Sequence, residues 1–297
     1  MPHNFSARPV SANRAEHAEG PMWDARRQEV LWVDIPNGHV HRSSVNPDGT
    51  LTLLGTHDIG QQVGAVVPNT EGGWLLATEF GFGTLSETGE LHVLAEPELG
   101  RRPETRMNDG KCDPLGRMWA GSMSYSETPG AGKLYLLDSM STEPRVSIGS
   151  VTISNGMAWT PDGRTMYYID TPTHRIDRVQ LSADGVIESR EPAIRIDPDL
   201  GSPDGMTIDD EGCLWVALWN GAAVHRYSPD GELLARVEVQ ASQVSSVAFG
   251  GPSMSTLFIT TSQENFSDAQ RAAEPEAGYV HAVETGVSGR PADAFRG

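Results

Sequence analysis

Short apolar runs, separated by turn residues, recur along the whole chain. Each copy has a turn containing Asp, Glu or Gly, and an apolar strand with an aromatic residue follows it. The aromatic markers of the six copies are Trp32, Trp74, Trp119, Tyr167, Trp215 and Phe258. Successive markers are 42, 45, 48, 48 and 43 residues apart, and about 40–45 residues is typical of one four-stranded blade of a β-propeller.

A second strand and a hairpin turn follow the markers. Residues 39–42 precede Asp48-Gly49, and residues 223–227 precede Asp230-Gly231; Asp-Gly is a hairpin signal because Gly tolerates positive φ. Helical periodicity is nearly absent, and only residues 268–273 are expected to form about one helical turn, in a loop of the last repeat. The pattern predicts an all-β, six-bladed β-propeller with four-stranded antiparallel blades.

The whole chain, residues 1–297, is expected to form this single domain. Propellers commonly close by pairing strands from the two ends of the chain. Residues 11–17 are the candidate for the closing strand.

One position, polar in five of the six repeats, recurs 10 to 13 residues before each marker. The six equivalent positions are Glu19, Gly64, Asn108, Asn155, Asp204 and Ser246. Because the innermost strand of each blade lines the central channel, residues in the same phase are expected to form a ring around the axis. Asn-Gly and Asp-Gly are also ordinary turn dipeptides, but their matching phase in several repeats favours a shared site.

The ring has the chemistry of a cation site. Four of its members are oxygen donors of the kind that hard divalent cations prefer. Glu19 and Asp204 together carry a charge of −2, which is unfavourable to bury unless it is neutralised. A divalent cation would cancel this charge, and Asn155 would add a carbonyl oxygen.

Composition narrows the classes of partner. The formal net charge is −18, from 22 basic and 40 acidic residues, which argues against nucleic acid and anionic membranes as partners. We find no signal-peptide pattern and no apolar run long enough to span a bilayer. The two cysteines, Cys112 and Cys213, are expected to be buried, reduced thiols. These features together predict a cytoplasmic protein.

No alternative catalytic motif stands out. Gly-x-Ser-x-Gly and His-Glu-x-x-His are both absent. Nine histidines are scattered along the chain, and only His39 and His41 have a spacing that suggests a metal pair. Because these two alternate on a strand, we interpret them as structural.

Several segments resemble the SMP-30/gluconolactonase/luciferin-regenerating-enzyme family. They lie in order between about residues 17 and 285: Glu19-Gly20-Pro21-Met22-Trp23-Asp24, Arg106-Met107-Asn108-Asp109-Gly110-Lys111, Gly116 to Met123, Ser154-Asn155-Gly156-Met157-Ala158-Trp159, Pro203-Asp204-Gly205-Met206, and Ala248-Phe249-Gly250-Gly251-Pro252. Each segment is weak alone, but the ordered set is specific. The resemblance implies a six-bladed propeller, one catalytic divalent cation and hydrolysis of sugar lactones.

The resemblance also implies roles for individual residues. The metal ligands of the family fall on Glu19, Asn155 and Asp204, and its substrate-contacting residues fall on Arg106 and Asn108. A further acidic residue of the family has no clean match here, and Glu127, one position out of register, is the nearest candidate for substrate binding. A second departure is His17-Ala18 before Glu19, where the family often carries Leu-Gly; this change is expected only to alter packing.

These assignments lead to a mechanistic hypothesis. The cation acts as a Lewis acid on the carbonyl of an aldonolactone, and Asp204 is the expected general base for the attacking water. Arg106 binds sugar hydroxyls, and Asn108 helps the cation to stabilise the oxyanion. The three ligands are compatible with Ca²⁺, Mg²⁺, Mn²⁺, Zn²⁺ and Fe²⁺, and they do not identify which cation binds. The sequence also leaves the particular sugar and the oligomeric state open.

Three alternatives remain open at this point. One is an organophosphate or aryl-ester hydrolase on the same scaffold, although Arg106 and Asn108 favour a hydroxyl-rich substrate. The second is a non-catalytic binding propeller, against which the convergence of two acids and two amides on the axis argues. The third is a calcium-storage or regulatory role for the same metal site.

Overall fold

Antiparallel β-sheets make up nearly all of the structure. The computed structural model describes residues 2–297, with 54% of the chain in strands and 5% in helices. The predicted all-β class is therefore confirmed. Among these residues no helix is long and apolar enough to cross a bilayer.

Four sheets are separate and each contains four strands. The first contains β3 (Ala18–Asp24), β4 (Glu29–Asp34), β5 (His39–Val45) and β6 (Leu51–Asp58); the second β7 (Val63–Pro68), β8 (Trp74–Thr78), β9 (Phe82–Leu85) and β10 (Leu91–Ala95); the third β11 (Thr105–Cys112), β12 (Met118–Ser124), β13 (Gly132–Leu137) and β14 (Arg145–Val151); the fourth β15 (Ser154–Trp159), β16 (Thr165–Asp170), β17 (Arg175–Leu181) and β18 (Ile187–Arg195). In each sheet, neighbours along the chain pair antiparallel.

The remaining sheet has nine strands. One part contains β19 (Ser202–Ile208), β20 (Leu214–Trp219), β21 (Ala223–Tyr227) and β22 (Leu233–Glu238), with β1 (His3–Ser6) added parallel to β22. The other part contains β23 (Gln243–Gly250), β24 (Thr256–Ser262), β25 (His281–Glu284) and β2 (Arg8–Pro9). A single residue pair, Trp219 with Gln243, joins the two parts.

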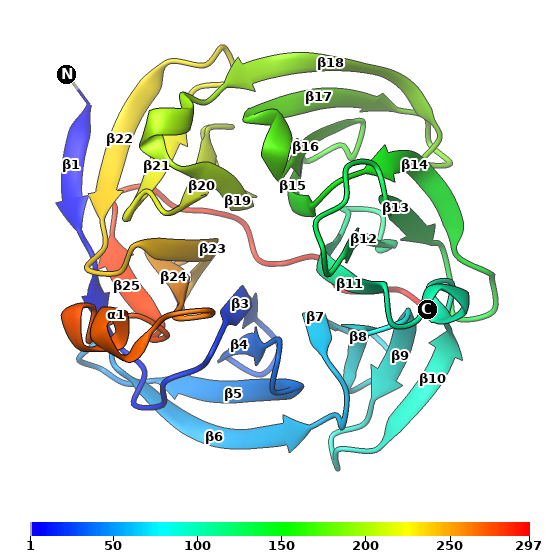
Figure 1. Cartoon of the computed structure of the whole chain (residues 1–297), viewed down its shortest axis with the longest axis horizontal. Helices are drawn as coiled ribbons and strands as arrows, with labels where there is room; N and C mark the ends of the chain where they lie inside the picture. The colour runs from blue at the N-terminus through cyan, green and yellow to red at the C-terminus, as the bar shows by residue number, and fades with distance from the viewer. Residues whose placement is uncertain (1) are drawn as a thin grey trace.

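The sheets are arranged radially around a central axis, as in a propeller (Figure 1). The first strand of each four-strand unit, namely β3, β7, β11, β15, β19 or β23, lies nearest the axis. The aromatic markers pack between the sheets, and Trp32, Trp74, Trp119, Trp215 and Phe258 are almost completely buried. Asp113 and Asp209 accept hydrogen bonds from the indole N–H of Trp119 and Trp215, both at 2.9 Å.

The two ends of the chain meet in one sheet, but the closing strand was predicted at the wrong residues. The pairing strand is β2, at Arg8–Pro9, which runs antiparallel to β25. Residues 11–17 instead connect this outer strand to the start of β3 near the axis, a path that a strand lying along the sheet edge cannot follow. Backbone hydrogen bonds such as Ala15 N–H to the Gly278 carbonyl, 2.8 Å, hold the connection.

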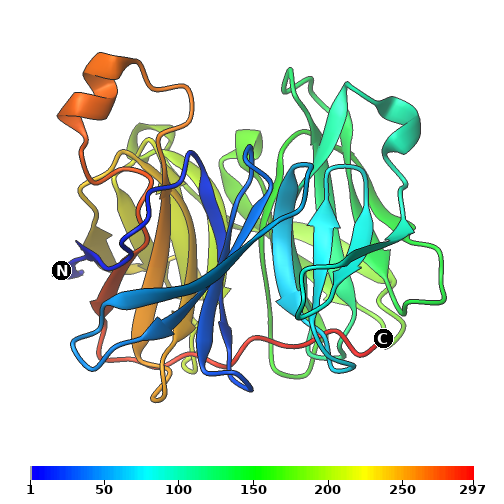
Figure 2. The same ribbon diagram turned by 90° about the horizontal axis from the view of Figure 1, so that it is seen from below.

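The two faces of the molecule differ. The only α-helix within residues 2–297, α1 (Asp268–Ala273), lies at the predicted residues in the loop between β24 and β25. Short 3₁₀ turns occur at η1 (Leu99–Arg101), η2 (Thr171–Thr173) and η3 (Pro198–Leu200). Figure 2 shows α1 on one face and the C-terminal segment crossing the opposite face. Near its end, Phe295 is fully buried, and the Phe295 N–H donates to the Pro68 carbonyl at 2.8 Å.

Both cysteines agree with expectation. Cys112 and Cys213 are buried and form no disulfide. Burial raises the pKa of both thiols, which keeps them protonated and unreactive near neutral pH.

Candidate active site

The six predicted ring positions all lie on the strands nearest the axis. Glu19 is on β3, Gly64 on β7, Asn108 on β11, Asn155 on β15, Asp204 on β19 and Ser246 on β23. The carboxylates and amides among them are buried, with 3–7% of each residue exposed. The repeat phase in the sequence therefore predicted which residues share the axis.

A β-bulge lies at or beside the ring position in each of these strands. The register shifts occur between Glu19 and Met22, Val63 and Ala65, Met107 and Gly110, Ser154 and Met157, Pro203 and Met206, and Val244 and Ser246. In every case the inner strand carries one residue more than its partner. Such an extra residue redirects side chains locally, and bulges are enriched beside active sites.

Glycines allow the inner strands to approach one another closely. A Cβ on Gly64 would lie 1.9 Å from the carbonyl oxygen of Asn108 in the neighbouring sheet. A Cβ on Gly205 would lie 2.0 Å from the hydroxyl oxygen of Ser246. These distances explain why one ring position is Gly and why Gly follows Asp204.

A chain of hydrogen bonds links three sheets across the site. Arg106 Nη1 donates to Asn108 Oδ1 at 2.7 Å, and Asn108 Nδ2 donates to Asn155 Oδ1 at 3.0 Å. Asn155 Nδ2 in turn donates to the Thr171 hydroxyl at 2.8 Å, and that hydroxyl donates to the Pro203 carbonyl at 2.8 Å. The amides of Asn108 and Asn155 are thus oriented by fixed partners.

This network corrects the expected role of Asn108 as an oxyanion donor. Both hydrogens of its Nδ2 are already used, one toward Asn155 and one toward the Ser154 carbonyl at 2.9 Å. Arg106 has used both hydrogens of Nη1, toward Asn108 and the Met107 carbonyl. Within residues 2–297, Nε and Nη2 of Arg106 make no hydrogen bond, so this guanidinium keeps three N–H donors for a ligand.

The positive charges near Glu19 and Asp204 are too few to keep both buried carboxylates ionised. Burial raises the pKa of Glu19 to about 8, and the charge of Asp109 adds to this effect. Burial, followed by Glu19 and Asp109, raises the pKa of Asp204 well above its usual range. Two carboxylates beside amide oxygens fit a hard divalent cation, whose charge would favour their ionised forms.

All six residues with predicted site roles line one cavity of about 450 Å³. Glu19, Asn155 and Asp204 share it with Arg106 and Asn108. Glu127 also lines the cavity, from the exposed loop between β12 and β13, where its φ is 50°.

Sequence reasoning missed part of this cavity. His17, Trp219, Gln243 and Glu264 also line it. The expectation that His17 only alters packing was wrong, because its position just before β3 places its ring in the cavity wall. Trp219 and Glu264 follow the markers of their repeats by four and six residues, where the chain returns to the same face. The four-residue offset recurs at Met123 and Thr171, which also line the cavity, so the repeat phase could have found Trp219 but not Glu264.

A second group of potential metal ligands lies outside the cavity lining. Asp34, His39 and His41 offer ligand atoms within 4.8 Å of one another. Burial lowers the pKa of His41 to about 4, so its imidazole is neutral. The Asp34 carboxylate also accepts the backbone N–H groups of Glu16 and His17, both at 3.1 Å. It therefore anchors the segment that leads to Glu19.

A radial array of antiparallel sheets with an acid- and amide-lined cavity on its axis defines a protein of the β-propeller type. The chain belongs to the SMP-30/Gluconolactonase/LRE-like family, whose model matches residues 17–263.

Individual relatives extend along nearly the whole chain. A 6-deoxy-6-sulfogluconolactonase of Pseudomonas putida is 35% identical, over 94% of each chain. A pentonolactonase of Haloferax volcanii is 33% identical, over 92% of each chain. The crystal structure of regucalcin from Agrobacterium tumefaciens, described as a calcium-binding protein, superimposes with a TM-score of 0.91 at 30% identity and covers 100% of this chain and 99% of its own.

Proposed function

We propose that this protein hydrolyses a sugar lactone to the open-chain aldonate and needs one divalent cation to do so. The observation that carries the proposal is the convergence of Glu19, Asn155 and Asp204 on one buried cavity together with Arg106 and Asn108. A relative named for a pentonolactone and another named for a sulfogluconolactone support the substrate class.

We also propose that the sheets form a six-bladed propeller. We count the nine-stranded sheet as two blades, because only one residue pair joins its two four-strand parts. This count gives six blades. We also treat residues 1–297 as one domain, since both ends of the chain contribute to the same sheet.

Glu19, Asn155 and Asp204 are the residues that would hold the cation. When bound, a divalent cation polarises an ester carbonyl and lowers the pKa of a coordinated water. Ca²⁺, Mg²⁺, Mn²⁺, Zn²⁺ and Fe²⁺ all remain candidates, and the calcium-binding description of regucalcin makes Ca²⁺ the first to test.

Side chains of the protein carry out proton transfer and substrate binding. Asp204 accepts a proton from the attacking water as general base. The water oxygen bonds to the carbonyl carbon, the ring ester C–O bond breaks, and the ring oxygen leaves with a proton as a hydroxyl. Arg106 donates Nε and Nη2 hydrogen bonds to substrate oxygens, and Asn108 offers its Oδ1 to a hydroxyl. Glu127 lies at the exposed rim and contacts the distal end of the substrate.

Acid release from a lactone panel in weak buffer tests this proposal. Glucono-, galactono-, xylono- and arabinono-lactone are compared with the spontaneous rate of each. The wild-type protein with Ca²⁺ is expected to exceed that rate for at least one lactone, and Asp204→Asn is expected to lose about 100-fold or more in kcat, the size typical of removing a general base.

Asp210→Asn is the matched control, because Asp210 is an exposed carboxylate outside the cavity. It is expected to keep wild-type activity. If no lactone is hydrolysed above its spontaneous rate with any of the five cations, the proposal is wrong. An aryl ester or organophosphate panel then distinguishes another hydrolase from a non-catalytic metal-binding propeller.

A further inference from the structure

Three side chains with metal-binding groups gather on one face of the first sheet, outside the cavity lining. His39 and His41 are two residues apart on β5, so both project from the same face of the strand. Asp34 on β4 pairs directly with His39, and directly opposite residues of antiparallel strands share a face. Each of the three offers a ligand atom, and no two of these atoms are more than 4.8 Å apart.

Both imidazoles keep a ring nitrogen for a ligand. His41 Nδ1 lies 2.8 Å from the Thr56 hydroxyl oxygen, and the His41 ring packs against Trp32, with centroids 5.2 Å apart. These two contacts orient the His41 ring. Within residues 2–297, Nε2 of His41 and both ring nitrogens of His39 make no hydrogen bond.

The Asp34 carboxylate is held by the segment that precedes β3. It accepts the backbone N–H groups of Glu16 and His17, both at 3.1 Å, and the Asn37 side-chain N–H at 2.9 Å. A carboxylate has about four acceptor sites, so Asp34 keeps one for a metal ion. Carboxylates that bind metals are commonly oriented by hydrogen bonds of this kind.

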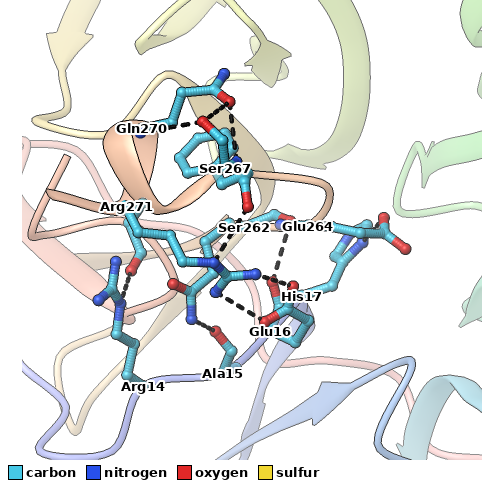
Figure 3. Close-up of polar contacts among 12 residues, drawn as sticks. Arg14, Ala15, Glu16, His17, Ser262, Glu264, Ser267, Gln270 and Arg271 are labelled. Atoms are coloured by element: carbon cyan, nitrogen blue, oxygen red, sulfur yellow. Dashed lines mark hydrogen bonds and ion pairs between the residues drawn. The ribbon is translucent and has the colours of Figure 1, made fainter. Parts of the chain in front are cut away.

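The same segment is fixed from its other side by the loop that carries α1. Arg271 donates to both carboxylate oxygens of Glu16, at 3.0 and 2.6 Å, and His17 Nδ1 lies 2.9 Å from Glu264 Oε2. Figure 3 shows Glu16 and His17 engaged with this loop. The carboxylate of Asp34 therefore meets a fixed backbone and is held in place before a metal ion arrives.

Two imidazoles and one carboxylate favour a different ion from the all-oxygen ring. Histidine suits Zn²⁺ and neighbouring transition metals, whereas Ca²⁺ and Mg²⁺ prefer oxygen ligands. Ligand atoms bound to Zn²⁺ at about 2.0–2.1 Å lie about 3.4 Å apart in a tetrahedral site. The three ligand atoms must therefore close by about 1.4 Å at most, the difference between 4.8 and 3.4 Å. A change of rotamer at the partly buried His39 can supply this closure.

We propose that Asp34, His39 and His41 form a second metal site, which binds one Zn²⁺ or a similar transition-metal ion, with water completing the coordination. This assigns to the two histidines a role that their position on a strand did not indicate. The ion joins β4 to β5 and, through Asp34, to the segment that leads to β3, so it stabilises this part of the fold. The inference is independent of the lactonase proposal.

Calorimetric titration of Zn²⁺ into the full-length Glu19→Gln/Asp204→Asn variant tests the site, because this variant lacks the two carboxylates of the axial ring. We expect one equivalent of Zn²⁺ to bind at micromolar protein concentration. At a 100-fold excess of Zn²⁺ over Kd, Tm should rise by roughly 4 °C. Co²⁺ in the same site should show the visible absorption of a four-coordinate ion.

Adding His39→Ala or His41→Ala to that variant should weaken Zn²⁺ binding at least about 100-fold, because losing a group that only hydrogen-bonds a metal ligand already costs about 10- to 100-fold. His92→Ala is the matched control, since His92 is an exposed histidine on β10 of the second sheet, and it should leave binding unchanged. Wild-type protein should also bind one equivalent of Zn²⁺ more than His39→Ala does, a comparison that does not depend on the axial substitutions.

Absence of Zn²⁺ binding to the folded Glu19→Gln/Asp204→Asn variant overturns the inference. Equal binding after His39→Ala and His41→Ala are added, or equal numbers of Zn²⁺ bound by wild type and His39→Ala, overturns it as well. None of these results bears on lactone hydrolysis, which is measured separately.

Discussion

Gly64→Ala tests whether close approach of the inner strands builds the site. Gly64 lies on β7, and an added Cβ would stand 1.9 Å from the carbonyl oxygen and 2.8 Å from the carbonyl carbon of Asn108 on β11. Both neighbours are backbone atoms, so no side-chain rotation relieves the clash. The φ of Gly64 is not in the left-handed region, and the effect therefore comes from space and not from backbone strain.

The size of the effect follows from that distance. Real Cβ contacts essentially never fall below 3.0 Å, so β7 and β11 must move apart by about 1.1 Å, the difference between 3.0 and 1.9 Å. Overpacking of this kind costs about 1–3 kcal/mol in free energy of unfolding, or roughly 2–10 °C in Tm. Because Asn108 donates to Asn155 at 3.0 Å, the shift also disturbs the candidate cation site.

Thermal and urea unfolding, together with calorimetric titration of Ca²⁺ into chelator-treated protein, measure both effects. Gly55→Ala is the matched control, because Gly55 on β6 has no atom within 4 Å of the added Cβ; this variant should stay within about 0.5 kcal/mol of wild type. Gly64→Ala is expected to unfold more easily and to bind Ca²⁺ at least several-fold more weakly. Wild-type stability and wild-type affinity in Gly64→Ala would refute the reasoning.

Three further predictions concern stability. In cation-free protein the pKa of Glu19 is raised from 4.5 to about 8, so the free energy of unfolding should fall as pH rises from about 5 to 8. In urea titrations Ca²⁺ should remove this fall, and Glu19→Gln should reduce it without removing it, because the pKa of Asp204 is raised as well. Phe295→Ala should cost about 3–5 kcal/mol in thermal unfolding because Phe295 is fully buried, whereas Leu54→Ala, at a side chain 51% exposed, should cost little; equal effects would contradict the role of the C-terminal segment. Asp113→Ala should lower the free energy of unfolding by about 3–5 kcal/mol because it leaves the buried Arg117 unpaired. Asp138 pairs with the exposed Arg145, so Asp138→Ala should change the free energy of unfolding by less than about 1 kcal/mol.

The sequence predicted the ring because one phase relates all repeats. Counting back from the buried aromatic markers located Glu19, Asn108, Asn155 and Asp204 on the inner strands. The same regularity predicted the all-β class, whereas the position of α1 was predicted from the separate helical pattern of residues 268–273. A residue's phase within a repeat depends only on local strand geometry, which the pattern of apolar residues carries.

Features that depend on packing between segments could not be predicted in this way. The closing strand was misplaced because residues 8–9 and residues 11–17 have no distinguishing pattern, and only the path from the outer edge to β3 separates them. His17 and Glu264 lie 247 residues apart, and their contact depends on how the α1 loop is held. The side-chain orientation of Asn108, which removes its free N–H donors, depends on neighbours from another sheet.

The most direct test of the central claim is lactone hydrolysis by chelator-stripped protein before and after a cation is returned. We expect no activity above the spontaneous rate without cation, restoration by one equivalent of an effective cation, and no restoration in Glu19→Gln or Asp204→Asn. His39→Ala, which changes only the separate Asp34, His39 and His41 group, should be restored like wild type. Full activity in the stripped protein, or full restoration in Glu19→Gln and Asp204→Asn, would contradict the claim that these inner-strand residues hold a cation needed for hydrolysis.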